Sequence, residues 1–315
     1  MFETNHSATG RLFYKGDQVR VRPLEDIIAT LDEKGTLGSL PFMPEMKQFC
    51  GREFTVSCRL EKTCVEGAGV RLLPDTVLLE GLRCEGTAHG DCQRSCSLLW
   101  KEAWLEPVGS GINHPPMQRP PSGPGSGFKL MTMTDEGLYF CQSTALHKAT
   151  RYLFPLSFKR CTAEYFAKNI GLQRSAQFLW VPLLVGLKSR LLGRAAVQPV
   201  GPFKRTPTET LNLQPGEWVE VKTPAEIGAT LDTAGFNRGL EFTPQMLPFC
   251  GGTFRVRGRV DCAILETTGK MRKFKNTVLL ENATCDGHTI LGGCSRDVYH
   301  YWREIWLRRS NPPIQ

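Results

Sequence analysis

GDQVRVRPLEDIIATLD, at residues 16–32, returns as GEWVEVKTPAEIGATLD at residues 216–232. Within these two stretches VRVR and VEVK alternate apolar and polar side chains, which is typical of a half-buried strand. The following EDIIATLD and AEIGATLD have the residue types of a short helix. The sequence therefore predicts that one strand–helix unit occurs twice in the chain.

The correspondence continues to the end of each copy. FMPEM at 42–46 matches FTPQM at 242–246, and TVLLE at 76–80 returns at 277–281. Each copy closes on a shared aromatic signature, WKEAWL in the first and WREIWL in the second. Self-similarity at a fixed offset indicates a duplicated structural unit, so we place the repeats at roughly 16–107 and 216–309.

Short strand-like runs separated by glycine and proline turns fill both copies. FTVSCRL at 54–60, FRVRGRV at 254–260 and the two TVLLE segments have this character. Many short strands with such turns favour a small barrel or roll. We therefore expect a mainly β fold with some α, in which two repeated small β-barrel or roll (SH3-like) modules flank a partly helical middle domain.

A chain of 315 residues is long enough for two or three domains. Its 41% hydrophobic and 22% charged residues are typical of folded chains and argue against disorder. A Pro/Gly/Ser-rich segment lacks a buryable face, and CTAEYFAKNIG has a helical pattern. We predict a first cysteine-rich β module at 1–110, a linker at 111–127, a basic, partly helical middle region at 128–206 and a second cysteine-rich β module at 207–315.

Twelve cysteines are present, and four of their positions recur in both copies. The N-terminus, MFETNHSATG, has no basic start followed by an apolar run, so we expect no secretory signal and a cytoplasmic location. In that compartment metal ligation is a more common use of clustered thiols than disulfides. The predicted metal ligands are Cys50, Cys64, Cys84 and Cys92 in the first copy and Cys250, Cys262, Cys285 and Cys294 in the second.

Four converging thiolates suit either tetrahedral zinc or an iron–sulfur cluster. Structural zinc usually draws its ligands in closely spaced C-x2-C pairs, and neither quartet contains one. Dispersed ligands must be assembled from several loops, which a bulky cluster tolerates. We therefore expect two iron–sulfur clusters, with zinc as the alternative. The third possibility is that the thiols bind no metal and are packed as small apolar side chains or form disulfides.

Several further side chains are left open as ligands or nucleophiles. Cys58 and Cys96 have no counterpart in the second copy, whereas His89 and His288 occupy the final loops out of register and are expected on the loop surface. Cys96 and Cys141 are the candidates for a catalytic thiol. His147 follows Cys141 by a spacing that does not bring two side chains together on a helix.

LRCEGTAHGDCQRSC followed by LLWKEAWL resembles a motif of bacterial proteins with paired cysteine-rich modules around a CQ-x-T middle region. In this chain the middle motif is Cys141-Gln142-Ser143-Thr144. The resemblance implies the domain layout but implies no enzymatic activity. The second copy departs from the pattern because it lacks the partner of Cys96 and the Ala-His-Gly sequence, so the first copy is the better candidate for a catalytic centre.

The net charge of +8 is concentrated in residues 151–205, which carry ten Lys and Arg against the single acid Glu164. Such a segment attracts an anionic substrate or an acidic protein partner, and nucleic acid less specifically. The apolar run 178–192 is too short and too broken by Pro182 to be a transmembrane segment.

The motifs of common hydrolases, kinases and dehydrogenases are missing from the sequence: it has no P-loop, no H-E-x-x-H and no G-x-S-x-G. Two functions remain. The first is an iron–sulfur protein in redox or cluster-dependent biosynthetic chemistry, as an oxidoreductase or biosynthetic enzyme. The second is a zinc-stapled, non-enzymatic binding protein for nucleic acid or an acidic partner.

Overall fold

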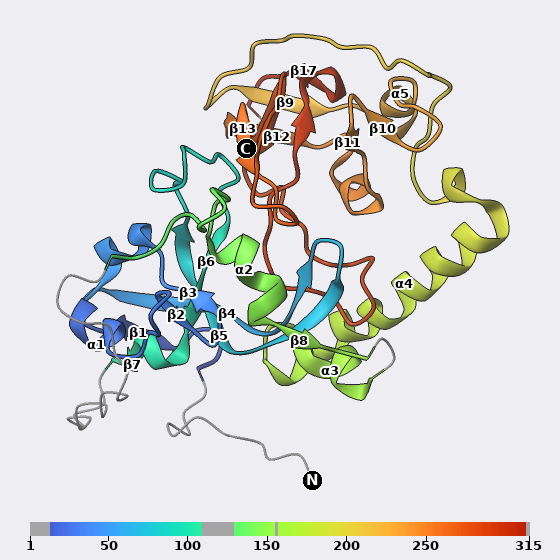
Figure 1. The fold of residues 1–315 in the computed structure, drawn as a ribbon. Helices are drawn as coiled ribbons and strands as arrows, with labels where there is room; N and C mark the ends of the chain where they lie inside the picture. Colours follow the sequence, from blue (N-terminus) through green and yellow to red (C-terminus); the bar gives the residue numbers. More distant parts are fainter. Residues whose placement is uncertain (1–12, 109–128, 155–156, 313–315) are drawn as a thin grey trace. The chain divides into compact units, whose positions relative to one another are not determined.

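The computed structural model describes residues 13–108, 129–154 and 157–312. The N-terminal segment used to predict the location and the predicted linker at 111–127 lie outside these residues. The mainly β class with some helix is confirmed, and the strands pair antiparallel (Figure 1). No closed barrel is found among the described residues.

Chain contacts divide the molecule into two compact units. Unit 1 contains residues 1–90, 97–171 and 266–270, and unit 2 contains residues 91–96, 172–265 and 271–315. Each unit thus includes a short segment from the other repeat. The predicted middle region is divided between the two units, and the four-part domain scheme stays a prediction.

Unit 1 is built on one sheet with the strand order β6-β5-β4-β1-β7, and β8 is added at β5. Its elements are β1 (Gln18–Val21), α1 (Leu24–Ile28), β2 (Thr36–Leu37), β3 (Leu40–Pro41), η1 (Pro44–Phe49), β4 (Glu53–Val65), β5 (Gly69–Arg83), β6 (Ser97–Lys101), η2 (Glu102–Trp104), β7 (Leu105–Pro107), α2 (Gln142–Ala149), β8 (Arg151–Tyr152) and α3 (Phe158–Phe166).

Unit 2 contains a sheet of matching order, β16-β15-β12-β9-β17. Its elements are α4 (Leu172–Leu192), η3 (Arg194–Ala196), β9 (Trp218–Val221), α5 (Pro224–Gly228), β10 (Phe236–Asn237), β11 (Leu240–Glu241), η4 (Pro244–Phe249), β12 (Thr253–Arg259), β13 (Cys262–Ile264), β14 (Met271–Lys273), β15 (Thr277–Leu280), β16 (Trp302–Arg303), η5 (Glu304–Trp306) and β17 (Leu307–Arg309).

The alternating residues of the first quoted stretch form β1, in which Val19 and Val21 are fully buried whereas Gln18 and Arg20 face solvent. The corresponding strand β9 buries Val219 and Val221 in the same way. The register is also equivalent, because Val19 pairs with Phe54 across β1 and β4 whereas Val219 pairs with Phe254 across β9 and β12. The two repeats therefore place the same residues on the core face of each sheet.

Each core is closed by the second tryptophan of the terminal signature. The indole nitrogen of Trp104 donates to Thr30 Oγ1 at 3.1 Å, and that of Trp306 donates to Thr230 Oγ1 at the same distance. The hydrogen bonds satisfy the polar atom of a buried ring. This contact fixes the 3-10 turn at the end of each repeat against the helix at its beginning.

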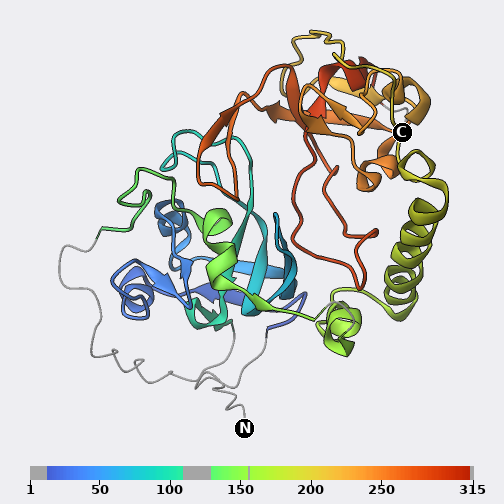
Figure 2. The ribbon, with the colours of Figure 1, turned by 45° about the vertical axis from the view of Figure 1, so that its right-hand side comes forward.

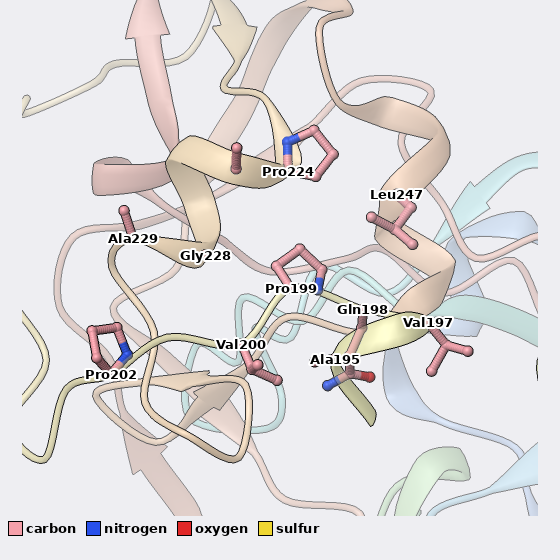
Figure 3. Close-up of a pocket in the computed structure, with 11 residues that line it drawn as sticks. Ala195, Val197, Gln198, Pro199, Val200, Pro202, Pro224, Gly228, Ala229 and Leu247 are labelled. Atoms are coloured by element: carbon pink, nitrogen blue, oxygen red, sulfur yellow. The ribbon is translucent and has the colours of Figure 1, made fainter. Parts of the chain in front are cut away.

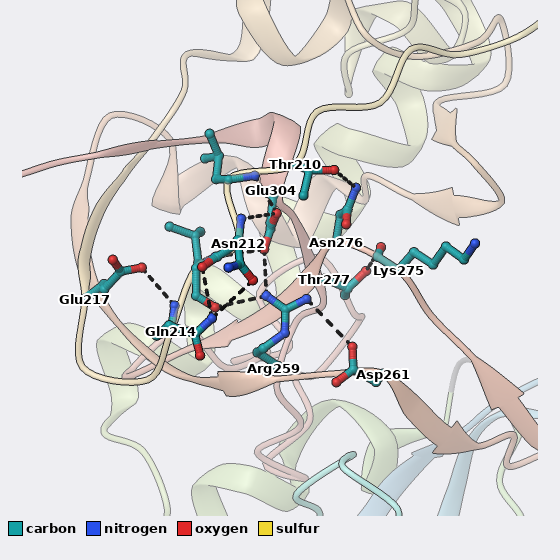
Figure 4. A network of polar contacts seen from close by, with 12 residues as sticks. Thr210, Asn212, Gln214, Glu217, Arg259, Asp261, Lys275, Asn276, Thr277 and Glu304 are labelled. Atoms are coloured by element: carbon teal, nitrogen blue, oxygen red, sulfur yellow. Dashed lines mark hydrogen bonds and ion pairs between the residues drawn. The ribbon is translucent and has the colours of Figure 1, made fainter.

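A buried glutamate from the same signature organises the polar side of each core. In unit 2, Arg259 Nη1 lies 3.0 Å from Glu304 Oε1, and Glu304 also accepts the backbone N–H groups of residues 211–213 (Figure 4). In unit 1, Arg59 and Glu102 form the equivalent ion pair. Breaking such a buried pair would leave an uncompensated charge, so the pair specifies how these segments enter the core.

α4 is the longest helix of unit 2 (Figure 2). It includes Pro182. Its contacts with the rest of the unit include Phe178, which is 4% exposed, and an ion pair between Arg174 and Asp286 at 3.1 Å, whereas Trp180 is 67% exposed. Within the described ranges, no helix combines the length and the apolar character that crossing a membrane would require.

Candidate metal site

Glu45 is the first of three polar residues that meet inside unit 1. It lies in η1, which begins at Pro44 because proline supplies the φ angle of a first helical turn. The tight turn directs Glu45 inward beside Met46, and the glutamate side chain is only 2% exposed. Carboxylates are rarely buried unless they are paired, so this position requires a partner.

Cys84 and His89 come from the loop that follows β5. Gly86 and Gly90 take positive φ angles of 73° and 62°, and the backbone N–H of His89 donates to the carbonyl of Gly86 at 2.9 Å. This turn folds the loop back on itself, and His89 becomes 1% exposed. The prediction that His89 lies on the loop surface is therefore wrong, because its ring occupies the space above Glu45.

The three side chains form a compact group. Glu45 Oε1 lies 2.6 Å from His89 Nδ1 and 3.9 Å from Cys84 Sγ, and it accepts the backbone N–H of Ala88 at 3.2 Å. One possible ligand atom from each of the three side chains lies within 4.8 Å of the other two. Among the residues that the structure describes, this is the one group of three or more His, Cys, Asp or Glu side chains with this property.

The second ring nitrogen of His89 fixes the proton arrangement. His89 Nε2 lies 3.1 Å from the carbonyl oxygen of Phe140, which can only accept, so Nε2 carries a hydrogen. His89 Nδ1 lies 2.6 Å from the carboxylate of Glu45, so the two atoms share a proton that a bound metal cation would replace. Donation from the far ring nitrogen to a backbone carbonyl is the usual arrangement around a metal-bound histidine.

The carboxylate of Glu45 is held in its charged form. Burial opposes ionisation, but the hydrogen bonds from His89 and the backbone outweigh burial and lower the pKa of Glu45 below its ordinary value of 4.5. Its second oxygen, Oε2, is buried and has no hydrogen-bond partner among the described residues. An ionised, buried oxygen without a donor is a strong candidate for a cation ligand.

The residue that precedes the CQ-x-T motif supplies the carbonyl that holds His89. Phe140 precedes the N-cap residue Cys141, whose backbone N–H donates to Thr144 Oγ1 at 3.0 Å. Gln142 is 4% exposed and donates through Nε2 to the carbonyls of Pro41 and Leu99 at 3.1 and 2.7 Å. The motif therefore anchors the beginning of α2 in unit 1.

Neither predicted catalytic thiol lies in such a group. Cys141 is buried at the beginning of α2, and Cys96 lies in the segment 91–96 of unit 2. A Cys–His pair also requires a ring nitrogen free to accept the thiol proton. In His89 one nitrogen faces Phe140 and the other faces Glu45, so the ring does not present a free base to Cys84.

The first predicted quartet is distributed over different parts of the molecule. Cys50 ends η1, Cys64 lies in β4 and Cys84 follows β5, all in unit 1. Cys92 belongs to unit 2, where its Sγ accepts the backbone N–H of Ile264 in β13 at 3.3 Å. Burial raises the pKa of the Cys92 thiol, and the charge of the nearby Cys96 adds to the increase.

The second predicted quartet lies within unit 2. Cys250 ends η4, and burial raises the pKa of its thiol to about 11. Burial likewise raises the pKa of Cys285 to about 11, and the charge of the nearby Cys294 adds to the increase. Cys262 lies in β13, where its thiol donates to the carbonyl of Asp91 at 3.4 Å.

In the second copy, Gln245 occupies the position of Glu45, and His288 is turned toward Asp286 at 2.6 Å rather than into the core. No group of three ligands is found there within the described residues. The pairing of thiols into two centres of four cysteines each stays a prediction of the sequence. Glu45 was missed because it is a single acid in an apolar stretch.

A pocket of about 520 Å³ also lies in unit 2, between the segment 197–202 and α5 (Figure 3). Its lining is almost entirely apolar, with the amide of Gln198 beside proline, alanine and valine side chains. It contains no titratable side chain and therefore offers no acid, base or metal ligand. Glu45, Cys84 and His89 remain the candidate site.

No protein-family model matches the chain, and neither the curated proteins nor the solved structures contain a significant match to it.

Proposed function

We propose that this chain is a metalloprotein with a single ion held by Glu45, Cys84 and His89. The proposal rests on the geometry of His89, whose Nε2 donates to the Phe140 carbonyl and whose Nδ1 faces the ionised carboxylate of Glu45. At 2.6 Å, His89 Nδ1 and Glu45 Oε1 share a proton, and a cation that takes the place of this proton would be bound by both groups. The half-buried thiol of Cys84 and the unpartnered Oε2 of Glu45 complete the donor set.

The donor set favours zinc over the other common metals. One sulfur, one imidazole nitrogen and one carboxylate oxygen are the ligand types of zinc sites, whereas calcium and magnesium prefer oxygen alone. An iron–sulfur cluster needs several thiolates, and this group contains one. When bound, a zinc ion would neutralise the carboxylate and stabilise the thiolate of Cys84.

The proposed role of the ion is structural. Glu45 belongs to η1, Cys84 and His89 belong to the loop after β5, and Phe140 joins them to α2. A metal at this point ties together segments that are far apart in the sequence, so part of the folding free energy of unit 1 would come from metal binding. This matches the second function considered from the sequence, a zinc-stapled binding protein.

The proposal also includes a binding surface for an acidic protein partner within the basic residues 151–205. α4 contains no Asp or Glu, and its exposed residues include both Trp180 and Leu187, each more than half exposed, and the bases Lys188 and Arg190. A basic helix with exposed apolar side chains can attract an acidic protein partner by charge and then bury apolar surface against it. We propose that this helix contributes to partner binding.

Metal analysis of two matched variants tests the proposed site. We expect Cys84→Ser to lose the bound zinc and Cys285→Ser, its counterpart in the second copy, to retain it. The reason is that only the first copy combines the cysteine with an acid and a buried histidine. Zinc, iron and acid-labile sulfide are measured in the protein purified without oxygen.

The competing proposal is the pair of iron–sulfur centres, each held by four cysteines. It is supported by the closeness of Cys92 to Cys96 and of Cys285 to Cys294, because the charge of Cys96 adds to the raised pKa of Cys92 and that of Cys294 adds to the raised pKa of Cys285. In that case both substitutions would remove iron, and the protein would be coloured. Equal metal loss in the two variants would therefore rule out a single mononuclear site.

A further inference from the structure

A second pocket in unit 2, of about 440 Å³, is strongly basic. Its walls come from the turn between β10 and β11, from β14 with the turn that follows it, and from β16. Five cationic side chains line it, namely Arg238, Arg272, Lys273, Lys275 and Arg303. The pocket is independent of the metal site, which lies in unit 1.

The positive charge of this pocket is not neutralised by the protein. Glu209 is the single acidic residue in its lining, and its carboxylate is paired with Lys222 at 3.2 Å. None of the five basic side chains forms an ion pair with another described residue. Arginines and lysines gathered in a concave surface attract and concentrate anions.

Arg303 forms the base of the cluster and is 7% exposed. Its Nη1 donates to the carbonyl of Lys275 at 2.7 Å and to Thr277 Oγ1 at 3.0 Å, and its Nη2 donates to the carbonyl of Arg238 at 3.0 Å. Its Nε is buried and has no partner among the described residues. Burial, together with repulsion from Arg272 and Arg238, lowers the pKa of Arg303 to about 10, so the guanidinium is still charged at neutral pH.

The first repeat shows that this concentration of charge is not required by the fold. Lys101 corresponds to Arg303 and donates to the carbonyl of Pro74 at 2.8 Å, just as Arg303 donates to that of Lys275. Arg71 corresponds to Arg272 and donates to Thr150. The remaining three positions carry no base in the first copy, where Leu72, Pro74 and Gly38 stand in place of Lys273, Lys275 and Arg238. The second copy therefore keeps the structural hydrogen bond and adds cations around it.

The polar walls of the pocket are held in place by an amide. Asn276 Nδ2 donates to Thr210 Oγ1 at 2.7 Å and to the carbonyl of Glu209 at 3.1 Å (Figure 4). These bonds fix the segment 208–210 along one side of the pocket. The side chain of Lys275 extends away from this network (Figure 4), so its ammonium group is available to a ligand.

We propose that this pocket of unit 2 binds a small phosphorylated ligand that carries several negative charges. A single carboxylate would neutralise one of the five cations, whereas a diphosphate or a sugar phosphate presents several oxygens to them. Arginine in particular forms paired hydrogen bonds with phosphate oxygens, and such charge-assisted bonds are stronger than neutral ones. The volume of the pocket lies in the range of small-molecule sites.

Binding of inorganic pyrophosphate to the full chain, measured by calorimetry at low salt, tests the proposal. We expect saturable binding with one site per chain. The exposed variants Arg272→Ala and Lys275→Ala are each expected to bind about tenfold more weakly, the loss that corresponds to one charge-assisted hydrogen bond. Lys34→Ala, at an exposed base of unit 1, makes the same charge change outside the pocket and is expected to bind like the unchanged protein.

Three results would overturn the proposal. The first is no measurable pyrophosphate binding by the folded protein. The second is an equal loss of binding in the Lys34→Ala and Lys275→Ala variants, which would mean that general positive charge and not this pocket attracts the anion. The third is a single-stranded oligonucleotide that binds this surface and is not displaced by pyrophosphate, which would assign the surface to nucleic acid.

Discussion

Glu45 and His89 form a buried polar contact in the first copy that has no equivalent in the second. Gln245 replaces Glu45, and the histidine of the second loop, His288, is shifted in register. In the first copy the carboxylate, the imidazole and the Phe140 carbonyl form one buried chain of polar contacts. The first repeat therefore has both the acid and the buried histidine, and the second repeat has neither.

Removing the charge of Glu45 is expected to abolish metal binding with little change in side-chain volume. Glu45→Gln keeps the shape but removes the anion that both His89 and a cation require, so we expect loss of the ion and about 2 kcal/mol lower free energy of unfolding. Metal content and denaturant unfolding measure the two effects. Glu85→Gln, at an exposed acid of the same loop, is the control and is expected to leave both unchanged.

Lys101 makes the stability of unit 1 depend on pH in a way that can be measured separately. Burial lowers the pKa of Lys101 to about 8 from its ordinary 10.5, although Asp75 and Glu102 act in the opposite direction. Between these values the unfolded chain binds more protons than the folded chain, so the free energy of unfolding increases as the pH rises from about 8 to about 10.5. The shift corresponds to about 3 kcal/mol.

The Lys101 contribution is measured as a difference between two proteins. Denaturant unfolding of the unchanged chain and of Lys101→Met, at pH values on either side of this window, isolates it from other titrating groups. We expect the increase in stability with pH to be larger in the unchanged chain. The same pH dependence in both proteins would show that folding does not lower the pKa of Lys101.

At the scale of elements, glycine decides how the segment before the second repeat packs. A Cβ atom on Gly201 would lie 2.2 Å from the carbonyl oxygen of Leu231 and 2.3 Å from that of Gly228, so the backbones approach too closely for any side chain. A parallel bridge between Phe203 and Asp232 continues this contact. The segment 197–203 is therefore held against α5 and the turn after it.

Two glycine-to-alanine variants of unit 2 are expected to have opposite effects. Gly201→Ala should lower the free energy of unfolding by about 1–3 kcal/mol because the added methyl group forces the backbone apart. Gly186→Ala, inside α4 with no atom near its added Cβ, should raise it by up to about 1 kcal/mol because alanine favours helix. Thermal unfolding of both variants compares them directly. A lower stability of Gly186→Ala would contradict a continuous helix at α4.

Across the whole molecule, the parts of the fold predicted from sequence are those set by local pattern. The alternation in VRVR gives β1, and the helical pattern of residues 161–171 overlaps α3 (Phe158–Phe166). The sequence predicts shorter separate strands in place of the long β4–β5 hairpin, because Pro and Gly are typical of turns. In the structure Pro74 and Gly81 lie within β5, whose pairing with β4 contains register shifts.

The candidate site could be predicted only in part, because its members are joined by tertiary contacts. Cys84 was identified from its recurrence, whereas Glu45 and the carbonyl of Phe140 belong to segments with no ligand pattern of their own. The segment containing Cys92 hydrogen-bonds to β13, where Gln93 N donates to the carbonyl of Cys262 at 3.0 Å. Spacing along the chain does not reveal such an exchange between repeats.

The position of the metal is the most direct test of the central proposal. A crystal of the protein purified with its native metal, measured at the zinc absorption edge, is expected to show one anomalous peak within about 2.0–2.3 Å of Glu45, Cys84 and His89 ligand atoms. A peak surrounded by four cysteine sulfurs, or a His89–Glu45 contact bridged by a proton with no peak beside it, would contradict this account.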